Sequence, residues 1–162
     1  MNLDINNALI RYLYKIMKMT YKGRYSVKNP EKYVGNPTNV IYRSSWERKM
    51  MKWCDMNPDV LQWGSEEHII PYKSPIDNRV HRYYVDFFVK VRNKQGVIEN
   101  YLVEVKPKKY TKPPKQNPPR RTQAWINEVK QWGVNSAKWK AAEEFCADRK
   151  WKFIILTEDQ LN

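Results

Sequence analysis

The spacing of apolar residues predicts alternating helices and strands. Apolar positions three and four apart predict an amphipathic helix over residues 3–18. A second helix should begin at Ser44 or Ser45 and end at Asn57-Pro58. Its expected buried stripe consists of Trp46, Met50, Trp53 and Cys54.

Runs rich in Val, Phe and Tyr predict a set of strands in the middle of the chain. Short apolar runs cover residues 60–63 and 67–72, and residues 80–91 have the pattern of one long strand. Residues 97–106 should be the partner of that long strand, because the intervening residues 92–96 are typical of a hairpin turn.

The last third of the chain predicts two helices and a final strand. Gly133 should separate the helices, and Trp125, Val129 and Trp132 are expected in the core. Residues 153–156 are continuously apolar, which predicts a strand buried on both faces. Helices, a strand meander, helices and a last strand together predict an α/β sandwich with a mixed sheet.

The charge balance narrows the classes of partner. The chain has 162 residues, with 30 Lys and Arg against 17 Asp and Glu, which gives a net charge of +13. This surplus favours nucleic acid, although an anionic membrane surface would satisfy the charge equally well. There is no apolar run long enough for a membrane-spanning helix and no signal-peptide core. Cys54 and Cys146 are too few for a disulfide framework or a zinc site, and are expected as small apolar residues on helices in a reducing cytoplasm.

Two basic segments are candidates for contact with nucleic acid. Residues 19–42 interleave lysines with Tyr21, Tyr25 and Tyr33, which predicts either an irregular wrap over the core or an arm that touches nucleic acid. Residues 107–121 are rich in proline and have no acid, which predicts an extended loop. Its basic residues would guide DNA towards the site: Lys108, Lys109, Lys112, Lys115, Arg120 and Arg121.

Two acids interrupt the apolar strands and suggest a catalytic site. If Gly96 is left-handed in a three-residue hairpin loop, Asn93 pairs with Val97. Asp86 then lies opposite Glu104, and Tyr84 opposite Lys106. Lys106 and Glu104 are two residues apart, so their side chains share a face.

Two facing carboxylates repel each other unless a cation lies between them. Mg²⁺ is suitable because it prefers oxygen ligands, and the Val105 carbonyl is a further candidate ligand. Lys106 would then orient a water molecule or stabilise developing negative charge. The alternative is a structural Lys–carboxylate pair at the surface.

Asp86 followed by Glu104-Val105-Lys106 resembles the PD-(D/E)xK motif of restriction-endonuclease-like nucleases, with Val85 where that motif usually has proline. Many members of the superfamily carry a further glutamate on a preceding helix, and Glu47 matches it. The similarity to the transposon-end endonuclease branch spans roughly residues 43–157. Ser44-x-x-Glu47 is also a capping box, so Glu47 has either a metal or water role or a helix-capping role.

The whole chain is similar to the head completion nuclease family of large tailed bacteriophages. This resemblance implies a restriction-endonuclease-like sandwich with an N-terminal helical extension, divided into residues 1–42 and a nuclease core of residues 43–162. It also implies an enzyme that uses Mg²⁺, with Mn²⁺ as a substitute, to hydrolyse phosphodiester bonds of packaged double-stranded DNA before heads and tails join. The expected location is the host cytoplasm or the virion, with portal or neck proteins as partners and no membrane. The rival hypotheses are a non-catalytic basic protein that plugs the portal, and an RNA-binding module.

Overall fold

The computed structural model describes residues 21–161, so the helix predicted over residues 3–18 lies outside the described residues. The central sheet has four strands in the order β3-β6-β7-β8. β6 is antiparallel to both of its neighbours, β3 and β7, and β8 is parallel to β7, which confirms the predicted mixed sheet. The bounds of these strands are β3 Val60–Ser65, β6 Phe87–Arg92, β7 Ile98–Val105 and β8 Lys152–Leu156.

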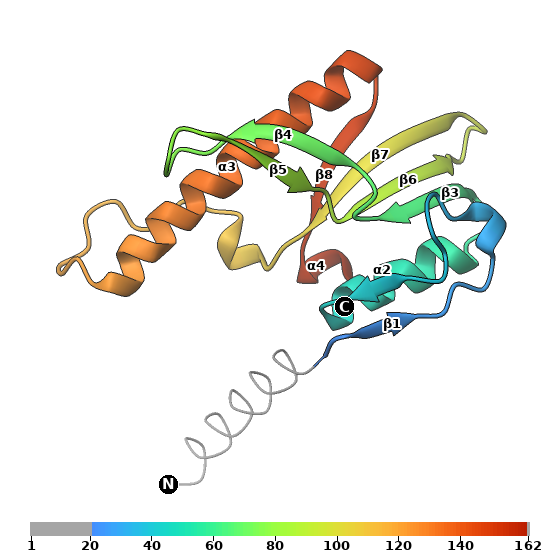
Figure 1. The fold of residues 1–162 in the computed structure, drawn as a ribbon, viewed down its shortest axis with the longest axis horizontal. Coiled ribbons are helices and arrows are strands. Elements are labelled where there is room, and N and C mark those ends of the chain that lie inside the picture. The colour runs from blue at the N-terminus through green and yellow to red at the C-terminus, as the bar shows by residue number, and fades with distance from the viewer. Residues whose placement is uncertain (1–20, 162) are drawn as a thin grey trace, which may run out of the picture.

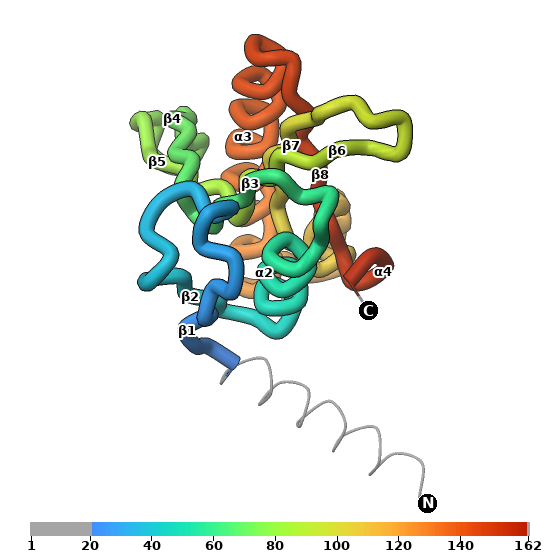
Figure 2. The backbone as a smooth tube through the Cα atoms, turned by 90° about the vertical axis from the view of Figure 1, so that its right-hand side faces the viewer, coloured from blue at the N-terminus to red at the C-terminus, as the bar shows by residue number. Residues whose placement is uncertain are grey.

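Helices cover both faces of the sheet, as the predicted sandwich requires (Figures 1 and 2). α2, Ser45–Met56, covers one face and the long α3, Gln123–Arg149, covers the other. Two small two-stranded sheets flank this body: β1 with β2, and β4 with β5. The remaining elements are β1 Gly23–Tyr25, η1 Pro30–Lys32, β2 Val40–Tyr42, β4 Ile69–Lys73, β5 Val80–Tyr84, η2 Lys108–Tyr110 and α4 Glu158–Leu161.

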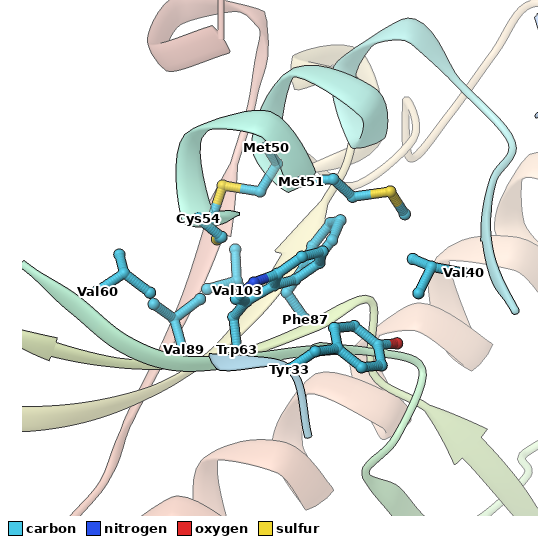
Figure 3. Close-up of a cluster of buried hydrophobic side chains, with 10 residues drawn as sticks. All are labelled: Tyr33, Val40, Met50, Met51, Cys54, Val60, Trp63, Phe87, Val89 and Val103. Carbon is cyan, nitrogen blue, oxygen red and sulfur yellow. The ribbon is translucent and has the colours of Figure 1, made fainter. Parts of the chain in front are cut away.

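The hydrophobic core has two clusters, one on each face of the sheet. Val103 faces α2 in one cluster, and its neighbour Leu102 faces α3 in the other, because side chains alternate along a strand. Trp63 is fully buried at the centre of the α2 cluster (Figure 3). Cys54 and Cys146 are buried and unbonded, one on each covering helix, which confirms their predicted packing role.

Residues 21–42 pack on the α2 side of the core. Tyr33 is buried and contacts Trp63 edge to face, with ring centres 4.8 Å apart. Tyr25 packs against the same cluster and donates a hydrogen bond to Asp55. The contacts of these two tyrosines support the interpretation that residues 21–42 wrap over the core. Because both rings pack inside the protein, they are not free to stack on bases.

The prediction of one long strand over residues 80–91 is wrong, because these residues form two separate strands, β5 and β6. β5 leaves the central sheet and pairs with β4, so Tyr84 lies opposite Ile69 and not opposite Lys106. The break falls at Val85 and Asp86, where the Val85 N–H donates to the carbonyl of His68. A continuous apolar pattern does not show where a strand changes partners, because both partner strands bury the same kinds of side chain.

The two helices predicted around Gly133 are one continuous helix, α3. A glycine inside a helix costs only about 1 kcal/mol. Burial of Trp139, Ala142 and Cys146 against the sheet outweighs that cost.

Three predictions of burial are also wrong. The buried stripe of α2 contains Met51 in place of Trp53, which is 47% exposed, and Trp46 is only partly buried. Val129 is exposed and Trp125 and Trp132 are only half-buried, because the first half of α3 extends beyond the sheet. Residues 153–156 are only partly buried, because β8 is an edge strand.

Candidate active site

The hairpin of β6 and β7 has the predicted register. Gly96 has a φ of +80°, and the Asn93 N–H donates to the Val97 carbonyl at 2.8 Å. Phe87 pairs with Val103 at the other end of the hairpin. The next pair in this register is Asp86 and Glu104, so the two acids are neighbours, as the sequence predicted.

Glu104 is held by donors on both of its carboxylate oxygens. The Tyr83 hydroxyl donates to Oε2 at 2.6 Å, and the Lys106 ammonium lies 3.0 Å from Oε1. Glu104 is only 5% exposed. Burial with two partners fixes the orientation of this carboxylate and places Lys106 beside it.

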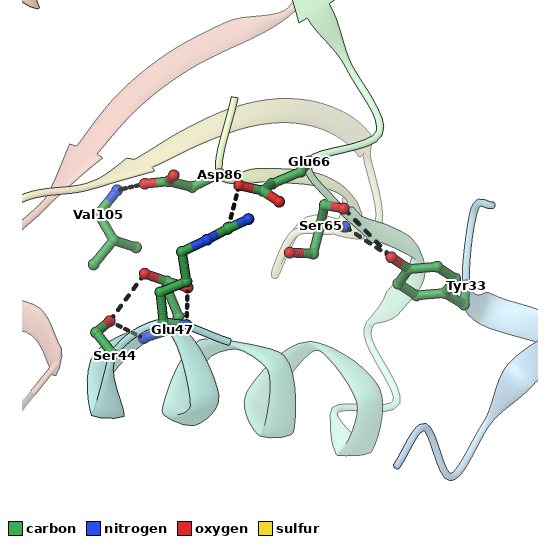
Figure 4. Close-up of polar contacts among 8 residues, drawn as sticks. Tyr33, Ser44, Glu47, Ser65, Glu66, Asp86 and Val105 are labelled. Atoms are coloured by element: carbon green, nitrogen blue, oxygen red, sulfur yellow. Dashed lines mark hydrogen bonds and ion pairs between the residues drawn. The ribbon is translucent and has the colours of Figure 1, made fainter. Parts of the chain in front are cut away.

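Asp86 has fewer partners. Within residues 21–161, its side chain accepts a hydrogen bond from the Val105 N–H, at 2.7 Å (Figure 4). Burial and the negative charge of Glu104 raise the pKa of Asp86 well above its usual range, and the charge of Glu47 raises it further. The Val105 N–H and the Lys106 ammonium lower this pKa without cancelling the rise.

Glu47 caps its helix and also faces the acid pair. The Ser44 hydroxyl accepts from the Glu47 N–H at 3.1 Å and lies 3.1 Å from Oε1. The Arg43 N–H donates to Oε2 at 2.7 Å (Figure 4). Burial raises the pKa of Glu47, and its charge acts on Asp86. These contacts confirm that Glu47 takes part in capping the helix, and its metal or water role stays a prediction.

Arg43 and Glu66 belong to the same site, and sequence reasoning missed Arg43. Its guanidinium pairs with Glu66, and this hydrogen bond, with the charges of Glu66, Glu47 and Asp86, raises the pKa of Arg43. Glu66 has a φ of +57°, and its N–H donates to the Asp86 carbonyl at 3.1 Å. No spacing rule predicts this contact, because it depends on the turn between β3 and β4.

The donor set can accommodate a hard cation. Within the described chain, no group of three or more His, Cys, Asp and Glu side chains is arranged to hold a metal ion. A metal would therefore depend on Asp86 and Glu104, the Val105 carbonyl and water, with Glu47 further out. Few protein ligands completed by water are typical of Mg²⁺. Burial first, and then the charges of Glu104 and Glu47, raise the pKa of Asp86, and a cation at this position would stabilise its ionised form.

A cleft of about 700 Å³ adjoins the acid pair. It lies between the residues that follow β7 and the first half of α3, and Glu47, Val105 and Lys106 are part of its wall. Lys109 and Lys112, two of the residues predicted to guide DNA, also line it.

The other basic residues of the loop lie outside this lining. Lys108 pairs with Asp159 of α4 at 2.6 Å, so its charge is partly neutralised. The Lys115 carbonyl accepts from the Trp125 indole, and Arg121 stacks on the same ring. Arg120 is exposed.

Comparison with known proteins gives two matches. The family model of the TnsA-like endonuclease N-terminal domain matches residues 57–158. The head completion nuclease of Enterobacteria phage T4 is 40% identical over 146 residues, which cover 88% of this chain and 95% of that protein. The chain belongs to this nuclease family. The predicted family and the restriction-endonuclease-like fold are confirmed.

The range of the TnsA-like match divides the candidate residues. Asp86, Glu104 and Lys106 lie within residues 57–158, whereas Glu47 precedes them. The side chains of the two histidines contact other groups: His68 stacks on Phe88, and His81 pairs with Asp77 at 2.8 Å. No helix within residues 21–161 has the length and apolarity needed to cross a membrane.

Proposed function

We propose that this nuclease is a Mg²⁺-dependent deoxyribonuclease that hydrolyses phosphodiester bonds of double-stranded DNA, with Asp86, Glu104 and Lys106 as its catalytic residues. The observation that carries the proposal is the hairpin register that brings Asp86 beside Glu104, with the Lys106 ammonium 3.0 Å from Glu104 Oε1, in a protein whose net charge is +13. The raised pKa of Asp86 supports it, because perturbed carboxylates are typical of functional sites.

Asp86, Glu104 and the Val105 carbonyl would hold the ion, and Glu47 would bind water or the ion from its position at the start of α2. A bound Mg²⁺ supplies Lewis acidity and neutralises charge on the phosphate. Mn²⁺ would substitute for it, because both ions prefer oxygen ligands.

Lys106 would position the attacking water. Its ammonium is fixed 3.0 Å from Glu104 Oε1 and is part of the wall of the cleft, so it can reach a phosphate as well as a carboxylate. A donor held in this way stabilises negative charge on the phosphate while water displaces the 3′ oxygen.

The basic loop would hold the DNA backbone. Lys109 and Lys112 line the cleft, and Lys115, Arg120 and Arg121 add positive charge around it. Such contacts position the backbone without reading bases, so little sequence preference is expected.

The similarity to the T4 head completion nuclease supports a role in completing phage heads. We infer that the protein acts on packaged DNA in the host cytoplasm before heads and tails join, and that portal or neck proteins are partners.

Cleavage of plasmid DNA in Mg²⁺ and in EDTA tests this proposal. We expect cleavage in Mg²⁺ or Mn²⁺ and none in EDTA. Lys106→Ala should abolish cleavage while it retains binding to DNA. Cleavage that persists in EDTA would refute the metal dependence. Binding without cleavage in either metal would indicate the rival hypothesis of a non-catalytic protein that plugs the portal.

A further inference from the structure

We propose that the cleft beside the acid pair binds unpaired nucleotides of one DNA strand. This inference rests on the proposed nuclease function and specifies the substrate further: DNA with a frayed, gapped or single-stranded end. The cleft's wall joins α2, the loop after β7 and the first half of α3, and it includes Glu47 and Lys106. A strand in the cleft would therefore lie next to the candidate catalytic groups.

Aromatic rings form part of this wall. Trp132 is half-buried and packs edge to face on the buried Trp139, with ring centres 5.9 Å apart. Tyr110 is 39% exposed, and the Lys109 ammonium lies 4.5 Å from the centre of its ring. Rings beside lysines are typical of surfaces that bind single strands, because bases stack on the rings and phosphates pair with the lysines. Paired bases in a duplex cannot offer their faces in this way.

Side-chain amides form another part of the wall. Asn127, Gln131 and Asn135 are four residues apart, so they share one face of α3, and all three line the cleft. The Gln131 amide donates to Asn135 Oδ1 at 2.9 Å, and Asn135 is only 3% exposed. Amides both donate and accept, so they suit the hydrogen-bonding edges of bases that have lost their partners.

The charge and size of the cleft agree with this ligand. Lys106, Lys109 and Lys112 line the cleft together with the acids Glu47 and Glu128, so the lining itself carries one more positive than negative charge, although Lys106 is also paired with Glu104. The volume of about 700 Å³ lies within the usual range for small-molecule sites. It suits about one or two nucleotides and is too small for a double helix.

Binding by a cleavage-deficient protein tests the inference directly. Full-length Asp86→Asn would be titrated with a blunt duplex and with the same duplex carrying a single-stranded overhang labelled with 2-aminopurine. We expect about tenfold tighter binding of the overhang, since stacking of a base on one aromatic side chain is worth about that factor. The 2-aminopurine fluorescence should be quenched when the base stacks.

Variants of the two rings sharpen this test. Tyr110→Ala, added to Asp86→Asn, should remove most of the preference for the overhang, and Trp132→Leu should do the same if it folds. The exposed Tyr110 is the safer site, because a surface change rarely affects folding. Trp53→Leu is the matched control: Trp53 is an exposed tryptophan of α2 that lines a different, apolar groove, so the preference should persist.

Equal affinity for both DNAs, or an unchanged preference in Tyr110→Ala, would overturn the inference. Cleavage by the unmodified protein separates this failure from failure of the proposed function. If blunt and overhanging DNA were cleaved equally well, only the inference would fail. If neither were cleaved in Mg²⁺ or Mn²⁺ while the binding preference persisted, the proposed function would fail and the strand-binding cleft would stand.

Discussion

Asp55 and Asp86 have the same side chain and opposite surroundings. Asp55 is completely buried at the end of α2, where it accepts hydrogen bonds from the Lys28 N–H at 2.7 Å and the Asn29 N–H at 2.9 Å. The Tyr25 hydroxyl donates to it as well, at 3.0 Å. Burial alone would raise the pKa of Asp55, but these donors outweigh it and hold the pKa below its usual value.

Asp86 has one backbone donor and two nearby carboxylates, and its pKa is raised. We infer from this difference that Asp55 is a structural acid, whereas Asp86 is the candidate for a functional one. Asp55 fastens residues 25–29 to α2 and needs nothing more. The single donor to Asp86 does not offset its burial and the two nearby carboxylates, and a divalent cation would stabilise its ionised form.

The largest expected difference between the two acids is in catalysis. Asp86→Asn should reduce the cleavage rate by a factor on the order of 10²–10³ or more, since it removes an ionised group from the reacting centre. Plasmid cleavage measures this effect. Asp148→Asn, on the exposed end of α3, is the control and should cleave normally. Cleavage by Asp86→Asn at the unmodified rate would refute the assignment of the site.

The same substitutions should change stability in opposite directions. Asp55→Asn should lower the free energy of unfolding by about 2–3 kcal/mol, because an amide replaces a charged acceptor and meets the two backbone N–H groups less well. Asp86→Asn should raise it by roughly 0.5–2 kcal/mol, as is usual when a strained functional group is removed. Urea denaturation compares the two variants. A loss of stability in both would remove the distinction between them.

The pH dependence of stability should also differ in sign. The folded-state pKa of Asp55 is lowered, so its contribution is present above the unfolded pKa of about 4 and is lost as pH falls through the folded pKa. The folded-state pKa of Asp86 is raised, so its contribution is present below about pH 4 and is lost as pH rises through the folded pKa.

Unfolding measurements between pH 3 and pH 8, without divalent metal, follow both effects. The advantage of Asp86→Asn over the unmodified protein should grow as pH rises above about 4. The deficit of Asp55→Asn should shrink as pH falls below about 4. Parallel pH profiles for the two variants would contradict the opposite pKa directions.

The last prediction concerns the tyrosines that donate to carboxylates. Tyr25→Phe and Tyr83→Phe each remove one hydroxyl donor, to Asp55 and to Glu104, and each should cost about 1.5–3 kcal/mol or less of stability. Only Tyr83→Phe should also slow cleavage, because it loosens Glu104 beside Lys106. Matched plasmid assays and unfolding curves separate the two. Equal cleavage rates in both variants would show that Glu104 does not need this donor.

Much of the site could be predicted from local sequence. Gly96 fixes the hairpin register that brings Asp86 beside Glu104, because a left-handed residue at that place defines the turn. Ser44 and Glu47 define the start of α2 by the chemistry of helix capping. These features depend on residues only a few positions apart.

The features that could not be predicted depend on contacts between distant segments. The change of partner after Tyr84, the continuation of α3 through Gly133 and the pairing of Arg43 with Glu66 all depend on which elements meet in space. Trp132 was expected in the core because it follows a helical spacing, but α3 extends past the sheet and leaves the ring beside the cleft. Periodicity shows which face of a helix is apolar, and it does not show how far the sheet extends beneath that face.

The most direct test of the account is the anomalous scattering of a crystal soaked with Mn²⁺. We predict a peak between the carboxylates of Asp86 and Glu104, with the Val105 carbonyl among the ligands, and loss of that peak in Asp86→Asn. A protein that cleaves DNA in Mn²⁺ but shows no ion at these two acids would contradict it.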